Sequence, residues 1–199
     1  MATPLSVLIL EDREGDAELM LHELRRAGFK PRWQRVETEQ DYLAYLTPTL
    51  DVILADYALP QFDALRALHL LQKCGLDIPF IVITGSISEE VVVECMKQGA
   101  ADYLLKDRLD RLGPAVTQAL KQRQLREEKR RAEAALRESE ARFRSAFDYS
   151  AIGMAVTEAG GKCLQVNRAL CRMLGFTPQE LAEVNFRALL DASDWAAYA

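Results

Sequence analysis

The sequence predicts an α/β domain in which a buried parallel sheet is covered by helices on both faces. Short apolar runs at residues 7–10, 52–55 and 81–83 alternate with longer amphipathic stretches, as expected for strands and crossover helices. A glycine also follows the basic last turn of three of these stretches, where a helix commonly ends. These glycines are Gly28, Gly75 and Gly99.

Strands and helices are expected to alternate in five units, which predicts a doubly wound sheet with strand order 2-1-3-4-5. Asp63 and Ser88 stand where the N-caps of the third and fourth helices are expected. The expected strands are residues 5–10, 32–36, 51–55, 78–83 and 101–105. The expected helices are residues 15–27, 39–46, 63–74, 88–97 and 109 onward.

Composition and charge narrow the class of protein. The 199 residues suffice for one complete domain and additional material. A 49% apolar content suits a globular protein, and a net charge of −5 gives no reason to expect nucleic acid or a membrane as partner. The N-terminus lacks the basic start of a signal peptide. We therefore expect a cytoplasmic protein whose cysteines are buried, reduced thiols: Cys74, Cys95, Cys163 and Cys171.

Polar side chains follow four of the expected strands at the point where each strand ends. Two acids, Glu11 and Asp12, follow the first strand, and Asp56 follows the third. Thr84 and Lys106 follow the fourth and fifth. Because ligands of such sheets bind outside the carboxyl ends of the strands, these groups should meet at one edge. Carboxylates suit Mg²⁺, while a hydroxyl and an ammonium suit phosphoryl oxygens.

This arrangement resembles the receiver domain of two-component response regulators, which has a flavodoxin-like fold. The resemblance covers about residues 5–122. It is carried by Leu-Glu-Asp at residues 10–12, Leu-Ala-Asp-Tyr-Ala-Leu-Pro at 54–60, Thr-Gly at 84–85 and Asp-Tyr-Leu-Leu-Lys at 102–106. Each motif alone is common, but all four in order, each at the end of an expected strand, are specific.

The resemblance implies a role for each matching residue. Asp56 would accept a phosphoryl group from a histidine kinase or a phosphotransfer protein. Asp12 would bind Mg²⁺ (or Mn²⁺), together with Asp56 and with Glu11 acting directly or through water. The remaining implied roles are a metal ligand at the backbone carbonyl of Ala58, phosphoryl contacts from Lys106 and Thr84, and a switch formed by Thr84 and Tyr103.

The segment that follows predicts one long helix. No glycine or proline occurs between residues 115 and 147, so a helix should run from about Leu109 to Phe147, with residues 123–141 as a linker. This segment is rich in basic residues, as nucleic-acid-binding segments also are. The glutamates between them favour a solvated helix or a weak two-stranded coiled coil instead. A homodimer through this linker is expected. Its sparse apolar seam comprises Leu125, Ala132, Leu136, Ser139, Phe143 and Ala146.

Residues 142–199 resemble the N-terminal half of a PAS sensor domain. Two short strands are expected around Gly160 and Gly161, followed by a helix with Asn167 as its N-cap. The expected partial α+β fold lacks the later strands of the family, so these residues cannot enclose its ligand pocket. We therefore expect the natural protein to continue beyond Ala199, or this fragment to use a partner. The PAS ligand stays unknown.

Together these observations predict a phosphorylation-dependent switch that signals through the helical linker to the PAS region and an absent output domain. The chain itself would not be an enzyme beyond its own phosphorylation and autodephosphorylation. Two alternatives stay open. One is a Mg²⁺-dependent aspartyl-phosphate hydrolase, which would need an Asp-x-Asp after the first strand, where Glu11-Asp12-Arg13 stands. The other is a receiver-like scaffold that binds partners without phosphorylation.

Overall fold

The computed structural model describes residues 2–60, 62–85 and 89–186. The expected N-cap Ser88 lies outside these residues. The chain divides into two compact units, Met1–Lys129 and Arg130–Ala199. The first unit carries the predicted α/β sheet, and the second carries a small antiparallel sheet.

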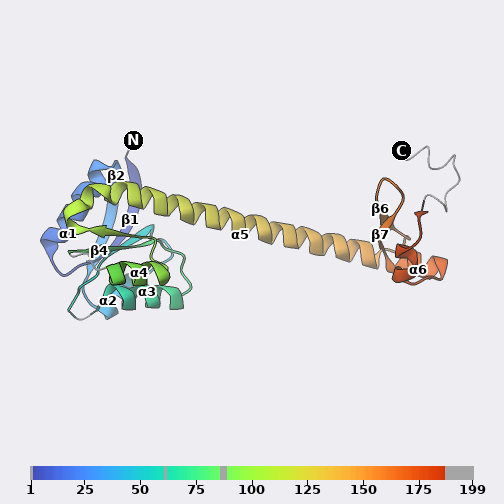
Figure 1. Ribbon diagram of the computed structural model, residues 1–199, viewed down its shortest axis with the longest axis horizontal. Helices are drawn as coiled ribbons and strands as arrows, with labels where there is room; N and C mark the ends of the chain where they lie inside the picture. The colour runs from blue at the N-terminus through green and yellow to red at the C-terminus, as the bar shows by residue number, and fades with distance from the viewer. Residues whose placement is uncertain (1, 61, 86–88, 187–199) are drawn as a thin grey trace. The chain divides into compact units, whose positions relative to one another are not determined.

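The N-terminal unit is built on a five-stranded parallel sheet with the order β2-β1-β3-β4-β5 (Figure 1). This confirms the predicted fold class and strand order. The strands are β1 (Thr3–Leu10), β2 (Phe29–Val36), β3 (Val52–Asp56), β4 (Phe80–Thr84) and β5 (Asp102–Leu105). The connecting helices are α1 (Glu14–Arg26), α2 (Glu39–Tyr45), α3 (Ala64–Lys73) and α4 (Glu89–Lys97).

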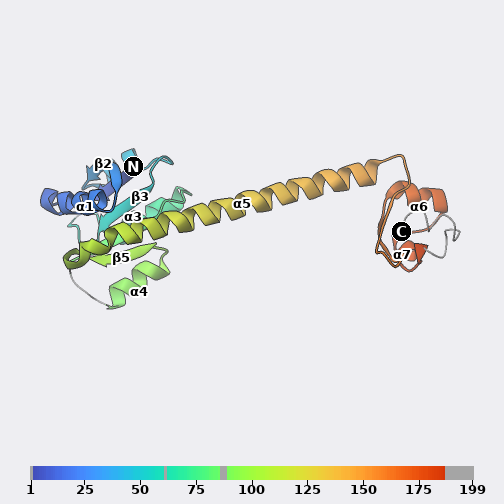
Figure 2. The same ribbon diagram turned by 90° about the horizontal axis from the view of Figure 1, so that it is seen from above.

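Helices cover both faces of this sheet. Figures 1 and 2 show α1 and the start of α5 (Leu112–Tyr149) on one face, with α2, α3 and α4 on the other. Alternate strand residues enter two cores: Leu54 and Ile81 pack toward α1 and α5, while Ile53 and Val82 pack toward α3. Because both faces are buried, β3 and β4 are apolar almost throughout, which explains the uninterrupted apolar runs in the sequence.

Local signals in the sequence act as predicted at several helix ends. The carboxylate of Asp63 accepts a hydrogen bond from the backbone N–H of Arg66 at 2.7 Å and caps α3. Gly99 ends the turn after α4 with φ of +95°, a conformation that favours glycine. The prediction for the cysteines is confirmed for Cys95 and Cys163, which are buried free thiols. It was wrong for Cys74, the C-cap of α3, which is exposed, and Cys171 is only half-buried.

The start of the long helix differs from the prediction. A 3₁₀ helix, η1 (Lys106–Arg111), precedes α5, and Arg108 within it has non-helical backbone angles. The α-helix therefore begins at Leu112 rather than near Leu109, and it runs without interruption to Tyr149. At its first turn Gly113 lies so close to α1 that a Cβ placed on it would stand 2.3 Å from the Cβ of Ala27.

Two arginines attach α5 to loops of the N-terminal unit beyond its buried first turns. The guanidinium of Arg123 donates to the backbone carbonyl of Leu50 at 2.8 Å. Arg126 forms an ion pair with Asp77, also at 2.8 Å, in which both side chains are more than half exposed. These contacts extend the packing of α5 well past Ala119, its last buried residue in this unit.

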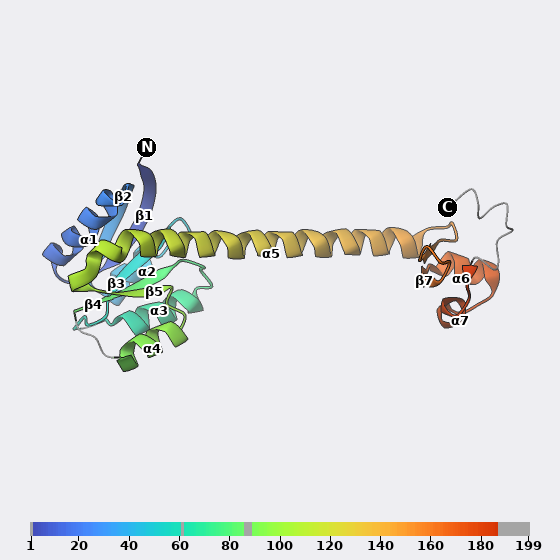
Figure 3. The same ribbon diagram turned by 45° about the horizontal axis from the view of Figure 1, so that its top comes forward.

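Up to residue 186, the C-terminal unit contains the predicted hairpin and two short helices (Figure 3). Strands β6 (Ala155–Thr157) and β7 (Cys163–Val166) pair antiparallel, followed by α6 (Arg168–Leu174) and α7 (Pro178–Ala182). Asn167 caps α6, as predicted, by accepting from the N–H of Leu170. Its fully buried amide also donates to the carbonyls of Phe147 and Ile152, which links the end of α5 to the hairpin.

Candidate functional site

The carboxyl ends of β1, β3, β4 and β5 bring the predicted polar residues to one edge of the sheet. Leu10 pairs with Ala55, so Glu11 and Asp56 follow at the same level on adjacent strands. On the next two strands Thr84 pairs with Leu105, and Lys106 comes directly after it. Residues that are distant in the sequence are therefore aligned by the parallel register.

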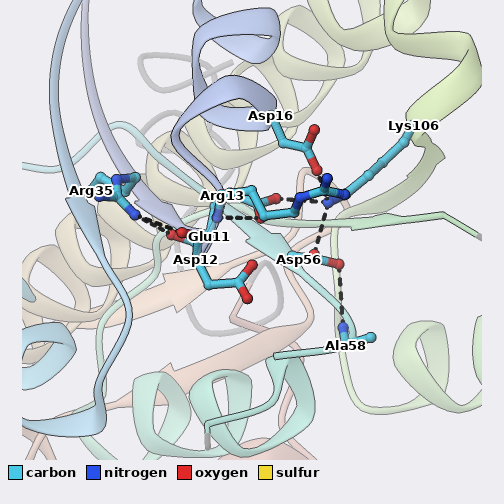
Figure 4. A network of polar contacts seen from close by, with 8 residues as sticks. All are labelled: Glu11, Asp12, Arg13, Asp16, Arg35, Asp56, Ala58 and Lys106. Carbon is cyan, nitrogen blue, oxygen red and sulfur yellow. Dashed lines mark hydrogen bonds and ion pairs between the residues drawn. The ribbon is translucent and has the colours of Figure 1, made fainter. Parts of the chain in front are cut away.

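Three carboxylates gather at this edge (Figure 4). Glu11, Asp12 and Asp56 each offer an oxygen, and these oxygens all lie within 4.8 Å of one another. Glu11 is completely buried and Asp56 almost so, whereas Asp12 is exposed. Carboxylate oxygens at this spacing are a donor set that suits a hard divalent cation such as Mg²⁺.

Lys106 brings a positive charge into the acidic cluster. Its Nζ lies 2.8 Å from Oδ2 of Asp56, 2.9 Å from Oε2 of Glu11 and 2.5 Å from Oδ2 of Asp16 (Figure 4). Burial by itself lowers the pKa of Lys106, but the hydrogen bonds to these carboxylates outweigh it and raise the pKa above its ordinary range. Lys106 is therefore an ammonium ion at neutral pH.

Glu11 has a different balance of forces. Its burial raises the pKa of the carboxyl above the ordinary value, because a low-dielectric surrounding disfavours the anion. The hydrogen bonds from Lys106 and from the backbone N–H of Arg13, the latter at 3.0 Å, act in the opposite direction. Glu11 is thus a buried acid whose charge depends on Lys106 and on any bound cation.

Of the other predicted residues, Thr84 and Ala58 lie beside Asp56, whereas Tyr103 stands earlier on β5. Thr84 is buried at the end of β4, one residue beyond the partner of Asp56 in the sheet. Tyr103 is half-buried on β5 and packs against the core on the α3 face. Ala58 is exposed in the loop after β3, and its N–H donates to Oδ1 of Asp56 at 3.2 Å.

Two residues of the site were not predicted. Asp16, in the first turn of α1, contacts Lys106. The sequence signal available for it is an acid at the start of the helix that follows Glu11 and Asp12. Arg35, near the end of β2, donates from one guanidinium nitrogen to the backbone carbonyls of Glu11 and Asp12, both at 3.1 Å (Figure 4). Arg35 also bonds Glu37.

Comparison with known families agrees with this geometry. Residues 7–117, more than half of the chain, match the family model of the response regulator receiver domain. The chain belongs to the response regulator receiver domain family. Residues 141–197 match the family model of the PAS domain. The receiver is thus a domain of two-component signalling, followed here by a PAS region.

Similar proteins of known sequence are mostly regulators. The chain is 33% identical over 106 residues to the phosphate regulon transcriptional regulatory protein PhoB of Klebsiella pneumoniae, covering 50% of this chain and 44% of PhoB. It is 36% identical over 72 residues to the luminescence regulatory protein LuxO of Vibrio campbellii, covering 36% of this chain and 16% of LuxO. A probable diguanylate cyclase of Escherichia coli, DgcE, is 50% identical over 52 residues, which are 26% of this chain and 5% of DgcE. The chain therefore spans less than half the length of each of these relatives.

Solved structures match the N-terminal unit. The receiver domain of a putative LuxO repressor from Vibrio parahaemolyticus superposes with a TM-score of 0.56 at 25% identity, covering 62% of this chain and 95% of that one. FixJ-N superposes with a TM-score of 0.52 at 28% identity, covering 59% and 94%. Within the described residues, none of the helices combines the length and the apolar character that a membrane crossing requires.

Proposed function

We propose that the protein is a phosphorylation-dependent signalling switch in which Asp56 accepts a phosphoryl group from a histidine kinase or a phosphotransfer protein. The observation that carries the proposal is the 2.8 Å contact between Lys106 and Asp56 inside a cluster of acids. An ammonium ion so placed offsets the charge that a phosphoryl group brings. Asp56 is also the acid that follows β3, the position of the acceptor in the receiver resemblance.

In the transfer, an Asp56 carboxylate oxygen attacks the phosphorus of a phosphohistidine. An O–P bond forms, the N–P bond breaks, and the imidazole leaves with the bond's electron pair and takes up a proton. Glu11, Asp12, Asp56 and the carbonyl of Ala58 would hold Mg²⁺, which when bound neutralises charge on the phosphoryl oxygens. The N–H of Ala58, already bonded to Asp56, orients the acceptor carboxylate.

The response to phosphorylation is assigned to Thr84 and Tyr103. The Thr84 hydroxyl, at the strand end beside Asp56, is the hydrogen-bond donor that a phosphoryl oxygen would recruit. Tyr103 lies one strand further on and is only half-buried, and in this proposal its ring turns inward as Thr84 shifts. Two packings of these side chains would constitute the two states of the switch.

The state of the receiver would pass along α5 to the PAS region. We propose a receiver at residues 1–122, a linker at 123–141 and a partial PAS domain at 142–199. Leu125, Leu136 and Phe143 expose more than half of their side-chain surface on α5, which supports a homodimer through this helix. An output outside residues 1–199 completes the proposal, and the similarity to a probable diguanylate cyclase is consistent with an enzymatic one.

Acetyl phosphate and Mg²⁺ test the acceptor assignment. Intact mass should show the gain of one phosphoryl group, which Asp56→Asn and addition of EDTA should each abolish. Asp63→Asn is the matched control, since it removes a carboxylate outside the acidic cluster yet keeps a capping side chain on α3. Equal labelling of Asp56→Asn would refute the assignment. Sustained turnover of a phosphomonoester would instead identify a hydrolase.

A further inference from the structure

Asp16 contacts Lys106 but takes no part in the phosphoryl transfer proposed for Asp56. It lies in the first turn of α1, and its Oδ2 is 2.5 Å from Nζ of Lys106. Both side chains are only 22% exposed, so water screens this pair less than it would a surface ion pair. The contact joins α1 to the residue that follows β5.

The number of donors on Lys106 explains the arrangement. A lysine ammonium has three N–H groups, and Lys106 has three carboxylate partners: Glu11, Asp16 and Asp56. Glu11 and Asp56 also belong to the group of acids whose oxygens lie close enough together to share a cation, and Asp16 does not. Of the three partners, Asp16 is therefore the one that serves the lysine without serving the candidate metal site.

We propose that Asp16 is a positioning residue that anchors Lys106 so that its remaining N–H is directed at Asp56 and, after transfer, at a phosphoryl oxygen. This inference rests on the proposed function of Asp56. Phosphorylation converts the Asp56 carboxylate into a neutral acyl group and moves its negative charge onto the phosphoryl oxygens. Lys106 then exchanges Oδ2 of Asp56 for a phosphoryl oxygen, while its bonds to Asp16 and Glu11 persist.

Lysine needs such an anchor because of its flexible side chain. Four rotatable bonds allow the ammonium many positions, and fixing it costs conformational entropy. Asp16 on α1 and Glu11, directly after β1, hold the Nζ from two sides, so the third N–H has one direction left. Without Asp16, Lys106 would retain only the Glu11 and Asp56 contacts and would lose its bond to the helix.

Three variants of the full 199-residue chain separate this role from a structural one. Asp16→Ala removes the anchor, while Asp16→Asn keeps the shape and a neutral acceptor. Glu14→Ala removes an exposed acid from the same first turn of α1 and controls for the loss of negative charge at a helix start. Mg²⁺ affinity and the rate of labelling by acetyl phosphate at saturating Mg²⁺ are measured for each.

We expect Asp16→Ala to label at least about tenfold more slowly than the parent, the scale of one lost charge-assisted hydrogen bond. Its Mg²⁺ dissociation constant should stay within about threefold, because Asp16 is not among the acids that share the cation site. Asp16→Asn should recover part of the rate, and Glu14→Ala should match the parent. Equal labelling rates for Asp16→Ala and the parent would overturn the proposal, as would a loss of Mg²⁺ affinity as large as the loss of rate.

A second measurement does not depend on phosphorylation. In protein with ¹⁵N-labelled lysine side chains, a bonded and partly buried ammonium exchanges its protons slowly enough to give a signal, which Lys106→Ala identifies. We expect this signal in the parent and in Glu14→Ala, and its loss in Asp16→Ala. Its persistence in Asp16→Ala would refute the anchor. If the parent gives the Asp16-dependent signal but is never labelled, the anchor stands and the proposed function of Asp56 fails.

Discussion

The Nζ atom of Lys106 lies 2.8 Å from Oδ2 of Asp56, although 50 residues separate them in the chain. The carboxylates of Glu11, Asp12 and Asp56 lie close enough together to repel one another, and the contact places a positive charge beside them. In the metal-free protein Lys106 therefore partly neutralises the acidic cluster. Because this ammonium offers no lone pair to a metal, its role can be separated experimentally from that of the acids.

Lys106→Ala should retain Mg²⁺ binding but label poorly with acetyl phosphate, because it removes the positive charge without removing a metal ligand. Asp12→Ala should lose both properties, with Mg²⁺ affinity falling by about tenfold or more. Titration calorimetry with Mg²⁺ and intact-mass labelling measure the two effects. The division of roles would be wrong if Lys106→Ala abolished Mg²⁺ affinity while Asp12→Ala preserved it.

Glu11 should give the metal-free protein a distinctive dependence on pH. Burial raises the pKa of Glu11 above the ordinary value of 4.5, so the folded state holds this proton more tightly than the unfolded chain does. The stability that the group contributes is complete below that value and is lost as pH rises through the raised pKa. Glu11→Gln cannot titrate, so its stability should decline less over the same interval.

Urea unfolding in EDTA, from about pH 4 to about pH 8, measures the difference between parent and Glu11→Gln. Glu14→Gln, an exposed acid in the first turn of α1, is the control and should follow the parent. Parallel curves for the parent and Glu11→Gln would contradict the raised pKa. Saturating Mg²⁺ should reduce the difference, because a bound cation favours the ionised carboxyl.

Arg35→Ala should weaken Mg²⁺ binding, by roughly three- to tenfold, because the loop that carries Glu11 and Asp12 loses the donor to both of its carbonyls. Arg32→Ala provides the comparison, since it removes the same charge from an exposed position on the same strand. Calorimetric titration should therefore rank the affinity of Arg35→Ala below that of Arg32→Ala. Equal affinities would show that the contact does not position the metal ligands.

The two arginines that attach α5 should differ in their effect on stability. Arg123 donates to the carbonyl of the buried Leu50, so Arg123→Ala should lower the free energy of unfolding by about 1–2 kcal/mol. The Arg126–Asp77 pair is exposed, so Arg126→Ala should cost less than about 1 kcal/mol. Urea unfolding of both variants provides the measurement. A larger loss for Arg126→Ala would reverse this assignment.

The sequence predicted the edge of the sheet well because parallel topology fixes where strands end. Once β1, β3 and β5 were placed, Glu11, Asp56 and Lys106 had to lie near one another. The roles of these residues in phosphoryl transfer stay predictions. Asp16 and Arg35 escaped notice because their contacts depend on side-chain direction, which alternation of apolar residues does not determine.

The prediction of the start of α5 failed for a similar reason. Residues 109–111 are compatible with an α-helix, and nothing in their composition marks the non-helical angles of Arg108. The 3₁₀ segment contacts α1, which is distant in the sequence, and such a contact cannot be deduced from the composition of the segment. The C-cap Cys74 likewise shows that a cysteine in a helical context need not be buried.

The contact between Gly113 and Ala27 links the permitted sizes of two distant residues. A methyl group on Gly113 would stand 2.3 Å from the Cβ of Ala27, so one of the two helices would have to shift. The inclination of α5 relative to α1 therefore depends on the small size of both Gly113 and Ala27. Among related chains, alanine at the position of Ala27 should therefore accompany glycine at the position of Gly113. A chain with alanine at both positions should carry a differently inclined α5.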